Sequence, residues 1–181
     1  MRDELETYRL LLRPPQDADA EAIFPLANNF AVAKNTISMP HPYTLDDARG
    51  FIARSRERRT KGIDYPFAVF RKGDMTLVGA VGVHPDLDYE LGYWIGEPFW
   101  GKGYATEAAR RVTRFAFEDL NAKEVRAGWY ADNPASGRVL EKIGFHYTTN
   151  EELPSVARGC AATCRRMVLT RSAFARLEQT P

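Results

Sequence analysis

Hydrophobic and polar residues follow two different spacings in the middle of the chain. From Tyr89 to Ile95 they alternate, which is typical of a strand with one buried face. Beyond that stretch, apolar residues recur at helical spacing, so we expect a helix from about Lys102 to Asp119. A strand, a short loop and a helix therefore follow one another here. The apolar face of the expected helix consists of Ala105, Ala108, Ala109, Val112 and Ala116.

The same spacings predict further strands and helices along the rest of the chain. Thr44 and Asp47 match a capping box, which predicts a helix start. Asn133 followed by Pro134 favours another helix start, and Gly144 suits the end of that helix. Other strands are expected at about 8–13, 67–71, 77–83, 125–130 and 163–170, other helices at about 17–28 and 172–178, and loops at 30–43 and 150–162.

The loop between the central strand and helix has the composition of a phosphate cradle. It contains Gly101, Gly103 and Ala105 at alternate positions, so few side chains block an approaching ligand. The two glycines allow the backbone to turn so that several N–H groups converge. The first N–H groups of the following helix have no partner within it, and the helix dipole is positive there. The loop is therefore expected to bind a phosphate or pyrophosphate.

Two common nucleotide-binding motifs fit this loop poorly. A P-loop requires Ser or Thr after its lysine, whereas Gly103 follows Lys102. A dinucleotide-binding fingerprint requires Gly or Ala where this chain has Thr106. Its acidic residue would be Glu124, which stands before the next expected strand. Both motifs remain weaker interpretations of the same glycines.

Composition narrows the class of protein. A chain of 181 residues with 44% hydrophobic and 27% charged residues fits one globular domain, expected over 7–175. The net charge of +1 gives no reason to expect a nucleic-acid partner, and no apolar run is long enough to span a membrane. The charged N-terminus lacks a signal-peptide core, so we expect a cytoplasmic protein. Cys160 and Cys164 fit no common zinc spacing, and no metal is expected.

Two motifs resemble those of the GNAT superfamily of acetyl-CoA-dependent N-acetyltransferases. The segment Trp100-Gly101-Lys102-Gly103-Tyr104-Ala105 is similar to its pyrophosphate-binding motif, in the form found in the RimJ/RimL-type branch. The segment from Asn133 to Phe145 resembles the second motif of the superfamily. Together they imply an α/β (α+β) fold with a mixed, mostly antiparallel sheet of six or seven strands and helices on both faces.

The resemblance implies acetyl-CoA as co-substrate. In such folds the strand before the pyrophosphate loop separates from its successor, and the pantetheine arm lies between them. Backbone groups of Trp94 and Ile95 would pair with this arm, and Asn133 would contact it while also capping its helix. Arg138 would meet the adenosine phosphates, unless it is a plain surface residue. The loop residues expected at the cofactor are Trp100, Gly101, Lys102, Gly103, Tyr104, Ala105 and Thr106.

Two residues are candidates for proton transfer. Glu90 lies on the strand leading to the loop, where related enzymes often carry a base, and it would relay the amine proton through water; it could also be a solvent-side strand residue. Ser136 matches the position where RimL-type enzymes offer a hydroxyl to the departing sulfur, although a local backbone bond is the alternative. His84 stands before a proline and is expected to be an ordinary loop residue.

The resemblance implies acetyl transfer to a primary amine by direct attack within a ternary complex. The acceptor could be a protein N-terminus or a small molecule such as a polyamine or an amino sugar, recognised by segments 28–43 and 150–162. A non-catalytic CoA-binding module on the same fold is a further alternative. The sequence leaves the oligomeric state open, a homodimer included.

Overall fold

The computed structural model describes residues 3–179 and consists of one open eight-stranded sheet with helices on both faces. The strand order is β1-β2-β3-β4-β5-β6-β8-β7, and only β5 and β6 run parallel. Residues 1–2, part of the N-terminal segment expected to lack a signal peptide, lie outside this range. The strands are β1 (Leu5–Glu6), β2 (Leu10–Arg13), β3 (Tyr65–Arg71), β4 (Thr76–His84), β5 (Glu90–Ile95), β6 (Glu124–Tyr130), β7 (His146–Ser155) and β8 (Cys160–Thr170).

Six α-helices and three 3-10 turns connect the strands of the described chain. The helix spacing predicted around Val112 and the capping signals at Thr44 and Asn133 all coincide with observed helices. The helices are α1 (Ala20–Ala27), α2 (Phe30–Ala33), α3 (Leu45–Thr60), α4 (Tyr104–Glu118), α5 (Pro134–Ile143) and α6 (Arg171–Glu178), and the 3-10 turns are η1 (Asp17–Asp19), η2 (Pro85–Leu87) and η3 (Glu97–Phe99).

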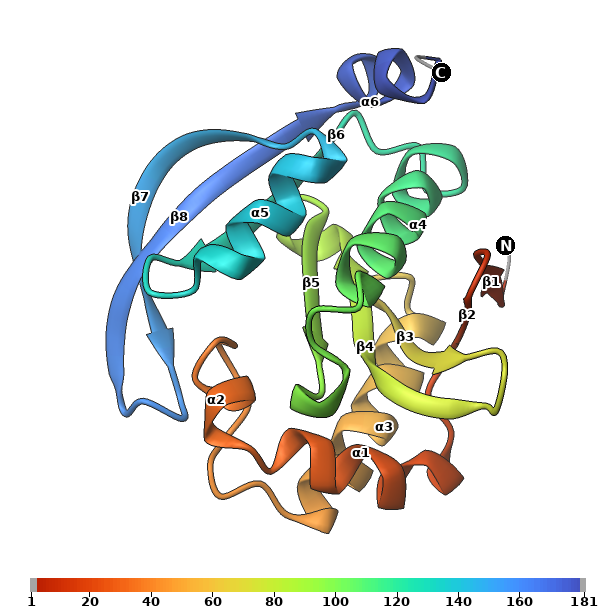
Figure 1. Cartoon of the computed structure of the whole chain (residues 1–181), viewed down its shortest axis with the longest axis vertical. Helices are drawn as coiled ribbons and strands as arrows, with labels where there is room; N and C mark the ends of the chain where they lie inside the picture. Colours follow the sequence, from red (N-terminus) through yellow and green to blue (C-terminus); the bar gives the residue numbers. More distant parts are fainter. Residues whose placement is uncertain (1–2, 180–181) are drawn as a thin grey trace.

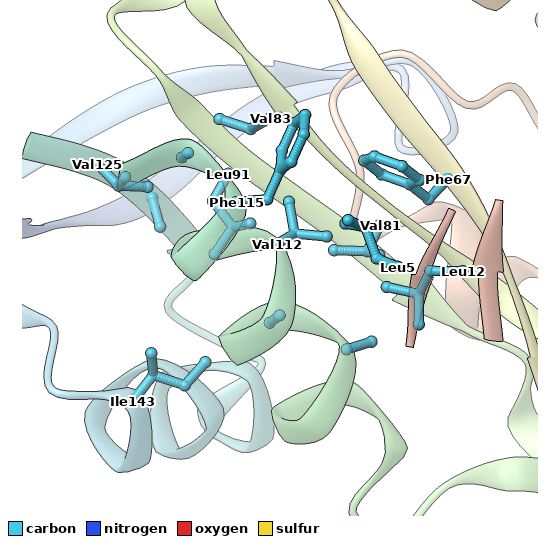
Figure 2. Close-up of a cluster of buried hydrophobic side chains, with 14 of the residues drawn as sticks. Leu5, Leu12, Phe67, Val81, Val83, Leu91, Val112, Phe115, Val125 and Ile143 are labelled. Carbon is cyan, nitrogen blue, oxygen red and sulfur yellow. The ribbon is translucent and has the colours of Figure 1, made fainter. Parts of the chain in front are cut away.

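The sheet is buried on both faces, and the period of its strands divides the core into two clusters. Phe67 and Val69 of β3 join the cluster under α4, whereas Ala68 and Phe70 join the one under α1 and α3. This alternation is the two-residue period of a pleated strand. Figure 2 shows the first cluster, with Phe115 of α4 among the side chains of β1 to β5. Among residues 3–179, no helix is both long and apolar enough to cross a membrane.

Two expectations about irregular segments were wrong. Residues 150–162 are not a loop, because β7 and β8 run through most of this stretch as a long hairpin along one side of Figure 1. Residues 30–43 contain the short helix α2, which Asn29 caps by accepting from the amide of Ala31. The sheet also has eight strands rather than six or seven, since Leu5 and Glu6 add β1.

The parallel pair β5 and β6 separates soon after it begins. Their register contains only Glu90 opposite Arg126 and Leu91 opposite Ala127. Beyond Leu91, β5 stays paired with β4 as far as Ile95, and β6 stays paired with β8. The sheet therefore opens between its two central strands, as the resemblance implied.

The capping box of α3 gives a prediction about stability. Thr44 Oγ1 accepts from the amide of Asp47 at 3.1 Å, and the Asp47 carboxylate accepts from the amide of Thr44 at 2.8 Å. Thr44→Ala should lower the free energy of unfolding by about 1 kcal/mol, because it leaves an N-terminal helix amide without its partner. Urea titration measures the change. Thr60→Ala at the other end of α3 is the control, and equal stability of T44A and wild type would contradict the prediction.

Candidate active site

The glycine loop opens onto a cavity of about 380 Å³ at the N-terminus of α4. Gly101 and Gly103 have φ angles of +72° and +79°, a region that side-chain-bearing residues rarely adopt. The first hydrogen bond of the helix runs from Glu107 N to Gly103 O at 3.1 Å. The amides that precede Glu107 in the first turn therefore have no acceptor within the helix. Tyr104, Ala105 and Thr106 carry these amides and line the cavity. The loop thus has the geometry of an anion cradle.

An ion pair from the edge of the sheet fastens the loop to the helix. Arg9 donates from Nη1 to Lys102 O at 2.9 Å and from Nε to Glu107 Oε2 at 2.7 Å. Glu107 also accepts from Thr7 Oγ1 at 2.6 Å. Burial alone would raise the pKa of Glu107, but the hydrogen bonds from Thr7 and Arg9 lower it below its usual value. The sequence analysis missed Arg9, because nothing near residue 9 indicates a contact almost a hundred positions away.

Two predicted cofactor residues of the loop use their side chains locally. Trp100 donates from Nε1 to Ile95 O at 2.6 Å, which holds the loop against the end of β5. Lys102 donates from Nζ to Pro98 O at 3.1 Å, so its side chain folds back onto η3. Lys102 does not line the cavity, whereas Trp94, Ile95 and Trp100 do. The side chain of Lys102 therefore contributes charge near the loop rather than a cavity wall.

The start of α5 forms the opposite wall of the same cavity. Three of the predicted site residues line it: Asn133, Ser136 and Arg138. Asn133 Oδ1 accepts from the amide of Ser136 at 3.4 Å, which caps the helix. Lys142 also lines the cavity and adds a second cation on this wall; the sequence analysis did not single it out. The wall carrying Arg138 and Lys142 is suited to phosphate groups.

Ser136 forms a hydroxyl pair with Tyr93 of β5 across the opening in the sheet. The Tyr93 hydroxyl donates to Ser136 O at 3.1 Å and lies 2.8 Å from Ser136 Oγ, where either oxygen can donate. Burial, opposed by the hydrogen bond with Ser136, raises the pKa of Tyr93 to about 12, so the phenol keeps its proton at neutral pH. Tyr93 was not among the site residues predicted from the sequence, because it stands 43 positions from Ser136.

A second cavity, of about 460 Å³, lies on the other side of the opening. Tyr93, Trp94 and Ser136 line both cavities, so the two meet where β5 and β6 separate. Glu90 lines only the second one, and its two carboxylate oxygens accept from Arg166 of β8 at 2.9 and 2.6 Å. The sequence analysis missed Arg166, because it stands 76 positions after Glu90.

Two distant segments close over the second cavity. Residues 35–40 line it from one side and Leu153 of β7 from another. Val156 N donates to Ile37 O at 3.1 Å, and Arg158 donates from Nε to Lys34 O at 2.7 Å. In Figure 1 the tip of the β7–β8 hairpin accordingly lies near α2. These are parts of the two segments expected to recognise the acceptor.

Comparison with known proteins identifies the family. The family model of the acetyltransferase (GNAT) domain matches residues 9–146. The chain is 33% identical over 150 residues to the probable N-acetyltransferase YjcK of Bacillus subtilis, covering 78% of this chain and 83% of that protein. The chain therefore belongs to the GNAT acetyltransferase family, and it is an acetyl-CoA-dependent N-acetyltransferase.

Solved structures show the same fold. RimL, a ribosomal L7/L12 α-N-protein acetyltransferase solved with coenzyme A, superimposes with a TM-score of 0.82 at 15% identity, covering 94% of this chain and 99% of RimL. A spermidine N-acetyltransferase of Vibrio cholerae solved with CoA and spermine gives 0.78 at 20% identity, covering 93% and 99%. The fold is therefore the GNAT fold, with structural neighbours of the RimJ/RimL type.

Proposed function

We propose that this chain transfers the acetyl group of acetyl-CoA to the α-amine of a protein or peptide N-terminus, by direct attack in a ternary complex. The observation that carries the proposal is the meeting of two cavities at Tyr93, Trp94 and Ser136. One cavity has the anion cradle of residues 101–106, and the other holds Glu90. A thioester seated in the first would present its carbonyl to an amine in the second.

On the cofactor side, we propose that the diphosphate of acetyl-CoA binds the amides of residues 101–106. Arg138 and Lys142 on the facing wall would pair with its phosphates. Pantetheine would lie along Trp94 and Ile95 and reach Asn133, with the thioester at the opening of the sheet. Ser136, backed by the protonated Tyr93, would give a proton to the leaving sulfur.

The preference for an α-amine follows from proton chemistry. An α-amine titrates near pH 8 and a lysine amine near 10.4. Forming the neutral amine at pH 7 therefore costs roughly 1.4 kcal/mol for the first and roughly 4.6 kcal/mol for the second. Glu90 is held in an ion pair with Arg166, which makes its carboxylate a weak base. Such a site suits the α-amine, because the α-amine loses its proton more easily than a lysine amine does. Glu90 would draw the ammonium into the cavity and hold it beside water that can carry its proton away.

A small polyamine is the second candidate acceptor, favoured by the structural likeness to the spermidine acetyltransferase. The charges that line the second cavity favour a polyamine less than they would if they were mainly acidic. Asp47 and Glu90 line the cavity together with Arg54 and Arg166, so its acidic and basic side chains balance. A polycation gains little attraction from such a lining. The third alternative, a non-catalytic CoA-binding module, is not supported, since the family and its relatives are N-acetyltransferases. We propose a single domain over residues 7–175, and a cytoplasmic location and a homodimer remain predictions.

One experiment distinguishes these candidates. Release of free CoA thiol is followed with acetyl-CoA and a panel of short peptides with free N-termini, matched N-blocked peptides that carry lysine, and spermidine. The proposal expects the free N-termini to stimulate release most strongly. Faster turnover with spermidine would make a polyamine the preferred acceptor, and a lack of stimulation by every amine in the panel would contradict the proposal.

Glu90→Gln tests the acceptor side. We expect kcat/KM for the amine to fall by on the order of tenfold or more, because a charge-assisted contact of about 1.5–3 kcal/mol is lost. The variant also leaves the Arg166 charge with Glu151 as its remaining carboxylate partner, so less of that charge is neutralised beside the ammonium group. Glu124→Gln is the matched control, since Glu124 pairs with Arg126 on β6 outside both cavities. Unchanged turnover and unchanged KM for the amine would remove Glu90 from the mechanism.

A further inference from the structure

An aspartate–histidine contact at the edge of the second cavity has no role in the scheme above. His84 is the last residue of β4, and Asp64 directly precedes β3. His84 Nδ1 lies 2.8 Å from Asp64 Oδ1, and the side chains are 29% and 12% exposed. His84 is therefore not the ordinary loop residue expected from its proline neighbour, but part of a partly buried dyad.

The surroundings of Asp64 favour a proton on Nδ1 of the imidazole. Asp64 Oδ2 accepts from Arg58 Nε at 3.3 Å. Asp64 Oδ1 is buried and has no hydrogen-bond partner within residues 3–179 other than the imidazole nitrogen beside it. An unpaired buried acceptor is costly, so Nδ1–H is the favoured form. A neutral imidazole with its proton on Nδ1 keeps its lone pair on Nε2.

That lone pair lies beside the cavity because the neighbouring strand has a glycine there. A Cβ atom added to Gly92 would lie 3.5 Å from His84 Nε2, so the imidazole edge packs over the bare backbone of Gly92. His84, Gly92 and Glu90 all line the second cavity. His84 is also the register partner of Glu90 across β4 and β5, which places both side chains on one face of the sheet.

We propose that His84 is the general base of the acetyl transfer and that Asp64 is the residue that positions it. The proposal rests on the proposed function, since it concerns the amine bound in the second cavity. His84 Nε2, directly or through one water, takes the proton that the acceptor loses before attack. Asp64 holds the imidazole in the required tautomer and stabilises the imidazolium that forms.

The protons and bonds balance without any further reactant. The acceptor ammonium carries three protons, of which one passes to His84 Nε2 and then to solvent. The neutral amine forms a C–N bond with the thioester carbonyl, and the C–S bond breaks as the thiolate of CoA leaves. A second amine proton is lost from the new amide and replaces the proton that Ser136 gives to the sulfur. The third stays on the amide nitrogen.

Glu90 is less suited than His84 to keep the proton. Both oxygens of Glu90 already accept from Arg166, so protonation would place a neutral acid against a guanidinium. His84 instead has a carboxylate at its other nitrogen. Asp64 contacts His84 directly and pairs with Arg58, which also pairs with Asp86. The other charged and titratable groups that line the cavity with His84 are Tyr43, Asp47 and Arg54, Glu90 and Tyr93 of β5, Tyr130 of β6, and Cys164 and Arg166 of β8.

His84→Gln gives the kinetic test, with the amine that the wild type acetylates fastest. We expect kcat/KM to fall by about 100-fold or more, and the acidic decline of kcat to move in H84Q to the pH at which the acceptor amine itself titrates. Glu90→Gln should keep the acidic decline of the wild type. His146→Gln is the matched control, because His146 is exposed on β7. Wild-type rate and an unchanged acidic decline in H84Q would overturn the proposal.

Chemical rescue separates chemistry from folding. His84→Ala leaves space beside the cavity, so added imidazole should restore part of its rate but should not speed up H146A. Absence of rescue in an H84A protein that binds CoA as the wild type does would count against the base role. Asp64→Asn should lower kcat by about tenfold or more while KM for acetyl-CoA stays unchanged.

Nitrogen-15 NMR of the histidines gives a readout that needs no acceptor. We expect neutral His84 to carry its proton on Nδ1 in the wild type, and to lose this preference in D64N. A proton on Nε2 in the wild type would overturn the proposal. If no amine stimulates thiol release by the wild type, the proposed function fails and the base role with it. If release occurs but the acidic decline of H84Q is the same as that of the wild type, only the assignment of His84 fails.

Discussion

Gly103→Val should weaken coenzyme A binding by on the order of 100-fold or more. Gly103 has a φ angle of +79° and caps the N-terminus of α4. A β-branched residue with this φ is strained by roughly 1–2 kcal/mol. A Cβ at this position would also lie 3.3 Å from Arg9 Nη2, within the ion pair that fastens the loop. Relaxing the strain turns the loop amides away from the diphosphate, and each lost charge-assisted hydrogen bond costs about 1.5–3 kcal/mol.

Isothermal titration of CoA into both proteins measures this loss. Gly62→Val is the matched control, since Gly62 has a φ angle of +72° beyond the end of α3 and lines neither cavity. The control should lose a similar amount of stability but bind CoA as the wild type does. Equal CoA affinity of G103V and G62V would mean that the loop does not hold the diphosphate.

Ser136→Ala should lower kcat by on the order of 100-fold while leaving the affinity for CoA nearly unchanged. General acid catalysis of this kind typically contributes that much to a rate. Tyr93→Phe should have a smaller effect on kcat. It removes the phenol that hydrogen-bonds to Ser136, whereas the Ser136 hydroxyl is the group proposed to protonate the sulfur. The double variant should lose less than the product of the two single effects, since both act on one proton.

Stopped-flow detection of free thiol with saturating acetyl-CoA measures these rates. Tyr89→Phe is the control for the phenol: Tyr89 directly precedes β5, and its hydroxyl donates to Leu120 O at 3.3 Å, outside both cavities. If S136A and Y93F turn over as fast as Y89F, the leaving sulfur obtains its proton elsewhere.

The features that were predictable from sequence are those set by neighbouring residues. The capping residues Thr44 and Asn133 and the terminating Gly144 act within one turn of helix, so their local pattern is sufficient. Gly101 and Gly103 likewise adopt the left-handed conformation that their spacing indicated. The turn before α4 and the start of α5, which face each other across the first cavity, were therefore predictable from the sequence.

The features that were missed depend on contacts between distant parts of the chain. The second half of β7 was expected to be part of a loop over 150–162, because residues 146–152 are exposed and no apolar alternation marks them. Arg166 reaches Glu90 only because β8 lies beside β6 in the sheet. The contact between Asp64 and His84 depends on the antiparallel pairing of β3 and β4. Local spacing carries no information on any of these.

NMR titration of nitrogen-15-labelled protein with coenzyme A tests the central claim most directly, because each loop amide gives its own signal. We expect the amide signals of Gly101, Gly103 and Ala105 to shift most, and the same signals to stay nearly unchanged with pantetheine, which lacks the diphosphate. Saturable CoA binding that leaves these three amides unshifted would contradict the account.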